Sequence, residues 1–143
     1  MRFLARREYS ACELRDKLVQ REFSDAIADQ ALSELARQNL QSDARYAEVF
    51  VRSKVTRGTG RFRIERELEQ KGVASGLIRE AITDADCDWF DLALQTYRKK
   101  YKSTDALDFR EKARRFRYMT SRGFDHEQIN YAIEQAGRED ESF

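Results

Sequence analysis

Apolar side chains recur along this chain at intervals of three and four residues, so that each stripe lies on one side of an α-helical turn. No sustained alternation of Val, Ile and Thr is present, so the pattern does not predict strands. With no proline and six glycines, the sequence has few residues that would break a helix. The pattern predicts an all-α protein. The stripes cover residues 14–18, 27–35, 46–51, 77–82, 89–97 and 129–136.

Polar residues and glycines mark where the predicted helices begin and end. The segments Ser10–Glu13 and Asp125–Gln128 have the spacing of a capping box, in which two side chains satisfy the free amides of a helix start. Gly72 and Gly123 each follow a stripe, where a left-handed backbone favours glycine. Three serines stand where N-cap residues are expected: Ser24, Ser42 and Ser75.

The sequence repeats itself three times. Residues 18–23, 68–73 and 119–124 superpose at spacings of 50 and 51. Each segment ends in an apolar residue, Phe23, Val73 or Phe124, and the eighth and ninth residues after it are apolar in all three copies. A predicted helix precedes each copy, at 2–8, 43–57 and 88–101. We therefore expect three tandem three-helix repeat units that stack into an elongated, curved array. The predicted units are 1–40 with a short first helix, 41–86, and 87–143 with an acidic tail.

Composition excludes several classes of protein. The chain has 143 residues with 27 basic and 26 acidic side chains, so it is not a uniformly basic DNA-coating protein. Nine Phe, six Tyr and one Trp provide enough apolar surface to argue against a disordered chain. No apolar run approaches the length of a membrane span, and the N-terminus lacks a secretion signal. Two cysteines, Cys12 and Cys87, form no disulfide framework, and we expect a reduced cytoplasmic protein.

The residues of common catalytic and metal sites are sparse. His126 is the only histidine, so we expect no histidine-based triad and no zinc site. Four aspartates at 84, 86, 88 and 91 are explained by the dipole of the helix that begins there. The turn at 58–60 contains two glycines but lacks the Gly-Lys-Ser/Thr ending of a phosphate-binding loop. We expect no catalytic residues, no metal and no cofactor.

Local charge is far less even than net charge. Residues 52–66 hold six basic residues and one acidic residue, and residues 98–117 hold nine and three. Arginine favours bidentate pairing with carboxylates or phosphates, so these patches could contact an acidic protein surface or DNA. The alternative is that they are solvated helix faces. The residues expected to contact a partner are Arg52, Lys54, Arg57, Arg61, Arg63, Arg66, Arg98, Lys99, Lys100, Lys102, Arg114, Arg115 and Arg117.

Residues 40–54 and 57–73 resemble the signature of the RecX regulatory proteins. The shared pattern is an acidic residue, a variable residue, Arg, an aromatic residue and Ala, then a Gly-X-Gly turn, an Arg-rich helix and Leu-X-X-Lys-Gly. Residues 5–14 and 122–124 resemble the family's first and third units, so the resemblance covers nearly the whole chain.

The resemblance implies a regulatory protein rather than an enzyme. Its partner would be the RecA filament on single-stranded DNA, and it would inhibit filament extension, ATPase, strand exchange and coprotease activity, thereby modulating recombinational repair and the SOS response. We expect a monomer that either caps the filament end or lies in its groove. The alternative is a helical protein that binds single-stranded or structured DNA directly, without RecA; a scaffold for an unrelated partner is a third reading.

Overall fold

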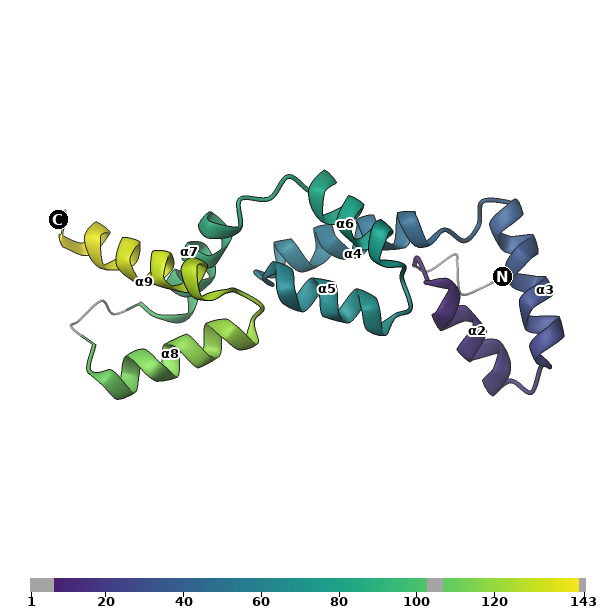
Figure 1. Ribbon diagram of the computed structural model, residues 1–143, viewed down its shortest axis with the longest axis horizontal. Coiled ribbons are helices and arrows are strands. Elements are labelled where there is room, and N and C mark those ends of the chain that lie inside the picture. Colours follow the sequence, from purple (N-terminus) through teal and green to yellow (C-terminus); the bar gives the residue numbers. More distant parts are fainter. Residues whose placement is uncertain (1–6, 103–106, 142–143) are drawn as a thin grey trace. The chain divides into compact units, whose positions relative to one another are not determined.

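The protein is described by a computed structural model over residues 7–102 and 107–141, without the side chains beyond 138. The described ranges contain eight α-helices and no strand, which confirms the all-α prediction (Figure 1). None of these helices is long and apolar enough to cross a membrane. The helices are α2 (Ala11–Gln20), α3 (Asp25–Arg37), α4 (Asp43–Thr56), α5 (Arg61–Gln70), α6 (Ser75–Asp84), α7 (Trp89–Lys100), α8 (Phe109–Ser121) and α9 (His126–Glu141).

The chain forms two compact units, and the division between them falls within α4 and α5. The first unit comprises residues up to 52 together with 66–85. In it, α2 packs against α3 around a small core (Figure 1). That core consists of Tyr9, Leu14 and Leu35, with Leu32 packed against it.

The second unit comprises residues 53–65 and those from 86 onward. Its helix α7 lies along α9, and α8 also contacts α9 (Figure 1). Apolar side chains of all three helices and of the turn before α9 are removed from water together, which is the main source of stability in such a unit. The buried cluster is Leu92, Ala93, Leu94, Tyr97, Met119, Phe124, Ile129, Ala132 and Ala136.

The threefold repeat of the sequence is confirmed in the backbone. Leu18, Leu68 and Met119 are all buried, and the carbonyl of each accepts from the amide five residues later at 3.1–3.3 Å. These bonds close the same C-terminal turn after α2, α5 and α8. The residue with positive φ in that turn is Glu22 (70°), Gly72 (78°) or Gly123 (102°). The repeats therefore contain α2–α3, α4–α6 and α7–α9, while the curved array stays a prediction.

Most predicted helix starts are confirmed. Both capping boxes are present, and the hydroxyls of Ser24 and Ser42 accept from the amides of Ile27 and Arg45. Ser75 was predicted as an N-cap and is instead the first helical residue of α6. The N-cap is Ala74, which has extended backbone angles and makes no side-chain cap. Helix α6 therefore begins one residue earlier than predicted from Ser75 as N-cap.

Two further predictions depart from the structure. Of the helix predicted at 2–8, residues 2–6 lie outside the described residues, and residues 7 and 8 are not helical. The predicted stripe at 89–97 begins with two adjacent aromatic residues, Trp89 and Phe90, and its pattern predicts both on the core side of the helix. Trp89 is half-buried against the second unit's core, but Phe90 is 40% exposed and its ring makes a T-shaped contact with the Tyr131 ring. Adjacent residues on a helix point in different directions, so only one of the two can face the core.

Candidate functional site: a basic pocket in the second unit

The basic residues predicted from the sequence fall into three groups. Arg52 and Arg66 are exposed and belong to the first unit. Lys54, Arg57, Arg61 and Arg63 lie around the turn between α4 and α5, within the second unit. The remaining residues lie on α7, directly after it, or on α8: Arg98, Lys99, Lys100, Lys102, Arg114, Arg115 and Arg117.

A backbone joint holds the turn between α4 and α5 against the turn after α8. Gly58, with φ of 77°, ends α4, and the amide of Gly60 then donates to the carbonyl of Arg122 at 2.7 Å. The Phe62 amide donates to the carbonyl of Gly123 at 3.1 Å. A Cβ on Gly60 would lie 2.4 Å from the Gly123 carbonyl carbon, so this approach requires glycine.

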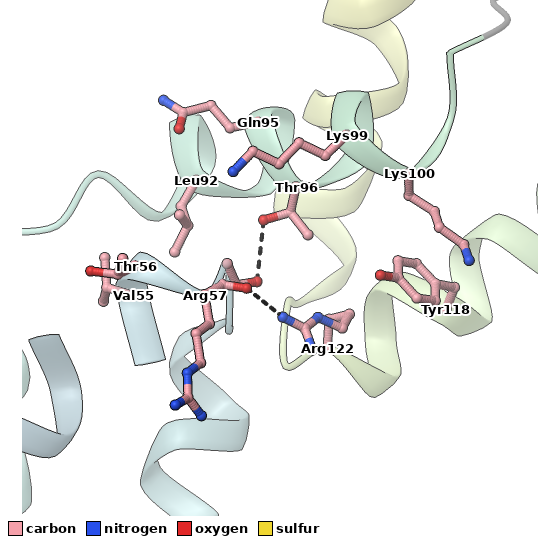
Figure 2. Close-up of a pocket in the computed structure, with 11 residues that line it drawn as sticks. Val55, Thr56, Arg57, Leu92, Gln95, Thr96, Lys99, Lys100, Tyr118 and Arg122 are labelled. Carbon is pink, nitrogen blue, oxygen red and sulfur yellow. Dashed lines mark hydrogen bonds between the residues drawn. The ribbon is translucent and has the colours of Figure 1, made fainter. Parts of the chain in front are cut away.

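Beside this joint, the second unit contains an open pocket of about 430 Å³ (Figure 2). Two hydrogen bonds to backbone carbonyls fix its walls: the Thr96 hydroxyl donates to Gly58 at 3.2 Å, and Nη2 of Arg122 donates to Arg57 at 2.7 Å (Figure 2). The lining residues are Val55, Thr56, Arg57, Gly58, Leu92, Gln95, Thr96, Lys99, Lys100, Tyr118 and Arg122.

The pocket is electropositive. Four of its lining residues are cations, and no carboxylate lines it. Among the described residues, none of these four cations forms an ion pair, whereas Arg61 is paired with Glu65 at 2.7 Å and Arg114 with Glu111 at 3.4 Å. The pocket thus brings together residues of both basic patches of the sequence: Arg57 of the first, whose guanidinium points away from Thr96, and the two lysines of the second (Figure 2).

Arg122 was not among the predicted contact residues. The sequence shows it only as part of the Arg-Gly-Phe that marks the third repeat. In the structure its guanidinium spans the pocket wall, and its buried Nε hydrogen has no acceptor among the described residues. A charged donor left in this state costs free energy unless a ligand or water accepts from it. The only indication in the sequence was the position of Arg122 in the repeated turn, two residues before Phe124.

Arg115 was predicted as a contact residue, but its guanidinium is committed within the second unit. The repeat places residue 115 where Leu14 and Ile64 stand, and it is only 8% exposed. It donates to the Tyr97 hydroxyl at 2.8 Å and to Glu111 at 3.0 Å. Burial would lower the pKa of Arg115, but these two partners raise it above its ordinary value. We therefore assign Arg115 to the core rather than to a contact surface.

The remaining candidate groups show ordinary structural roles. Asp88 caps α7 by accepting from the amide of Asp91, and within the described ranges no cluster of His, Cys, Asp and Glu could hold a metal ion. Burial, followed by the charges of Asp88 and Asp91, raises the pKa of the Cys87 thiol, so its reactive thiolate is disfavoured. His126 is exposed at the start of α9, with its ring against Phe116.

The sequence was compared with models of known protein families. The sequence models of the first, second and third three-helix domains of RecX match residues 1–35, 42–82 and 86–133. This chain belongs to the RecX family. The matches follow the threefold repeat and cover most of the chain.

Individual RecX proteins agree with this assignment. The chain is 43% identical over 136 residues to a "Regulatory protein RecX" of Chromohalobacter salexigens, covering 95% of this chain and 89% of that protein. It is 39% identical over 141 residues to the protein of that name from Halorhodospira halophila, covering 99% and 88%. A RecX of Legionella pneumophila is 36% identical over 135 residues, covering 94% and 90%.

Solved RecX structures share the fold at low sequence identity. The crystal structure of RecX from Lactobacillus salivarius has a TM-score of 0.79 at 19% identity, covering 94% of this chain and 89% of that one. A second RecX crystal structure also has a TM-score of 0.79, at 21% identity, and this chain spans 66% of its length.

Proposed function

We propose that this chain regulates the RecA recombinase by binding RecA filaments on single-stranded DNA and restraining their extension. The match of all three helical domains to RecX, whose members are named regulatory proteins, is the observation that carries the proposal. Lower ATP turnover, strand exchange and coprotease activity would follow from shorter filaments. The chain would act as a cytoplasmic monomer and by binding, not by catalysis.

The exposed face of α8 supports a contact with such a filament. Arg110, Arg114 and Arg117 are all exposed and lie four and three residues apart, so they share one face of the helix. Arg115 and Met119 are buried and lie four residues apart, so they form a second face. The arginine row can pair with carboxylates of a protein surface or with DNA phosphates.

Charge reversal on this row tests the proposal. We expect Arg114→Glu with Arg117→Glu to weaken binding to RecA filaments by about tenfold, since exposed pairs contribute modestly and add up. A matched control is Arg37→Glu with Arg79→Glu, which changes the net charge equally at exposed positions outside both patches. Co-sedimentation with filaments measures binding, and circular dichroism checks helix content. Equal losses in the two double variants would contradict the assigned face, and no binding by wild type would contradict the proposal.

Direct binding of DNA remains the second candidate, because the pocket of the second unit gathers cations without carboxylates. Salt separates the two candidates. Binding through phosphates falls log-linearly and steeply with salt concentration, whereas a contact between protein surfaces falls less. A shallow dependence for the filament and negligible affinity for bare DNA are the results that favour RecA regulation.

A further inference from the structure

We propose that the pocket beside the joint between the α4–α5 turn and the α8–α9 turn binds a phosphomonoester, the doubly charged phosphate group of a nucleotide or of a phosphorylated strand end. The proposal concerns the free protein and does not depend on RecA. It rests on the pocket's charge, on the fixed guanidinium of Arg122, and on the pocket's size and lining.

The positive charge of the pocket favours an anionic ligand. Arg57, Lys99, Lys100 and Arg122 line a single cavity, whereas Arg114, outside it, is paired with Glu111 at 3.4 Å. Screening in salt acts over about 8–10 Å, so charges gathered in one pocket act together on a ligand. A phosphomonoester carries a charge of about −1.5 to −2 near pH 7, against −1 for a phosphodiester. The monoester therefore balances this site better than a link of the nucleic-acid backbone.

The donors of the pocket also suit phosphate oxygens. Arg122 is held in place by its bond to the Arg57 carbonyl, and this leaves its Nε hydrogen buried and without an acceptor among the described residues. Because one end of the guanidinium is already fixed, the positive charge of Arg122 is held at the pocket wall before any ligand binds. The lysines of α7 add flexible ammonium groups, of which Lys100 lies 5.2 Å from the Tyr118 ring centroid (Figure 2).

The rest of the lining suits an organic group attached to the phosphate. Leu92 and Val55 supply apolar surface, and Tyr118 supplies an aromatic ring. The volume of about 430 Å³ lies within the range of small-molecule pockets, which is larger than a bare phosphate needs. Phosphate, base and sugar of one nucleotide are therefore the expected class of ligand.

Titration of the full chain followed by amide NMR tests the site, with the signals of Gly58, Lys99 and Arg122 as reporters. We expect AMP to shift these signals saturably and adenosine not to do so. The two sources of the phosphate are separated by a ten-residue oligothymidylate with and without a 5′-phosphate. Tighter binding of the phosphorylated strand would extend the site to strand ends, while binding of AMP alone would restrict it to free nucleotides.

Matched variants keep the test specific. Lys99→Gln with Lys100→Gln should weaken AMP binding by about tenfold or more, since charge-assisted bonds are lost. Arg114→Gln with Arg117→Gln removes the same charge outside the pocket and should change it less than about twofold. Equal losses in both double variants, saturable binding of adenosine at the same amides, or saturable and equally tight binding of both oligothymidylates there would each overturn the proposal.

Discussion

The amide of Gly60 donates to the carbonyl of Arg122 at 2.7 Å, across 62 residues of sequence. The first two repeats are offset by 50 residues, so Gly60 corresponds to Ser10 of the first repeat. The second and third are offset by 51 residues, so Arg122 corresponds to Lys71 of the second. Ser10 makes the corresponding contact through its hydroxyl, which donates to the carbonyl of Lys71 at 2.9 Å. The start of one repeat's second helix thus meets the turn after the next repeat's second helix, once within each compact unit.

This joint predicts a sharp sensitivity to added side chains. Gly60→Ala and Gly123→Ala should each lower the free energy of unfolding by about 2–4 kcal/mol, because left-handed backbone disfavours alanine at 123 and both Cβ atoms collide with backbone. Gly137→Ala is the control: nothing lies within 4 Å of its Cβ position in α9, and it should stabilise by about 0.5–1 kcal/mol. Urea unfolding measures all three. A Gly60→Ala protein as stable as wild type would contradict the joint.

The first repeat offers the opposite substitution. Glu22 adopts φ of 70° at the position held by Gly72 and Gly123, and its side chain is exposed. Left-handed backbone costs a non-glycine residue about 1–2 kcal/mol, partly offset by the greater freedom of glycine in the unfolded chain. Glu22→Gly should therefore raise the unfolding free energy by about 0.5–1 kcal/mol in thermal or urea denaturation. A clear loss of stability would show that the glutamate side chain contributes a contact of its own.

Arg115 provides a test of the buried charge in α8. Arg115→Ala removes the partner of the Tyr97 hydroxyl and of Glu111, and it opens a cavity where the other repeats hold Leu14 and Ile64. We expect a loss of about 2–4 kcal/mol, because the truncation removes packed side-chain volume and leaves the buried Tyr97 hydroxyl without this partner. Arg114→Ala, one residue away and exposed, should lose less than about 0.5 kcal/mol. Similar small losses for both variants in urea titrations would rule out the structural role of Arg115.

Glu13 predicts a pH dependence in the first unit. Burial would raise its pKa, but the Ser10 amide, Arg7 and Lys71 together lower it below the ordinary value of 4.5. Its charged form therefore adds stability above pH 4.5, and that contribution is lost as pH falls through the lowered pKa of the folded state. Glu13→Gln keeps a cap but removes the charge, so it should cost about 1 kcal/mol at pH 7, and this cost should shrink as the pH falls below 4.5. A difference from wild type that is constant with pH would contradict this assignment.

The sequence was sufficient for the parts of the fold that depend on local pattern. The spacing of Leu18, Leu68 and Met119 gave the repeat, and Gly72 and Gly123 gave the left-handed turns, because each is a property of one helix and its end. The exposure of Phe23 was not predictable in this way. It is 46% exposed, whereas the equivalent Val73 and Phe124 are 5% and 3% exposed, since burial depends on what packs against the turn.

The candidate site, too, could be predicted from the sequence only in part. Charge counts found the patches that supply Arg57, Lys99 and Lys100 to the pocket, but they could not show that long-range backbone contacts bring these patches together. Nor could they separate the buried Arg115 from the exposed Arg114. Comparing the three repeats position by position would have found Arg115, because a leucine and an isoleucine occupy its place in the other two.

The most direct test of RecA regulation is the ATPase activity of RecA on single-stranded DNA, with this protein added after filaments have formed. The account predicts a progressive decay of turnover at ratios well below one molecule per RecA, because a blocked filament loses subunits that it cannot replace. Turnover that stays unchanged even at excess protein, while the protein binds bare DNA, would contradict RecA regulation and favour direct DNA binding.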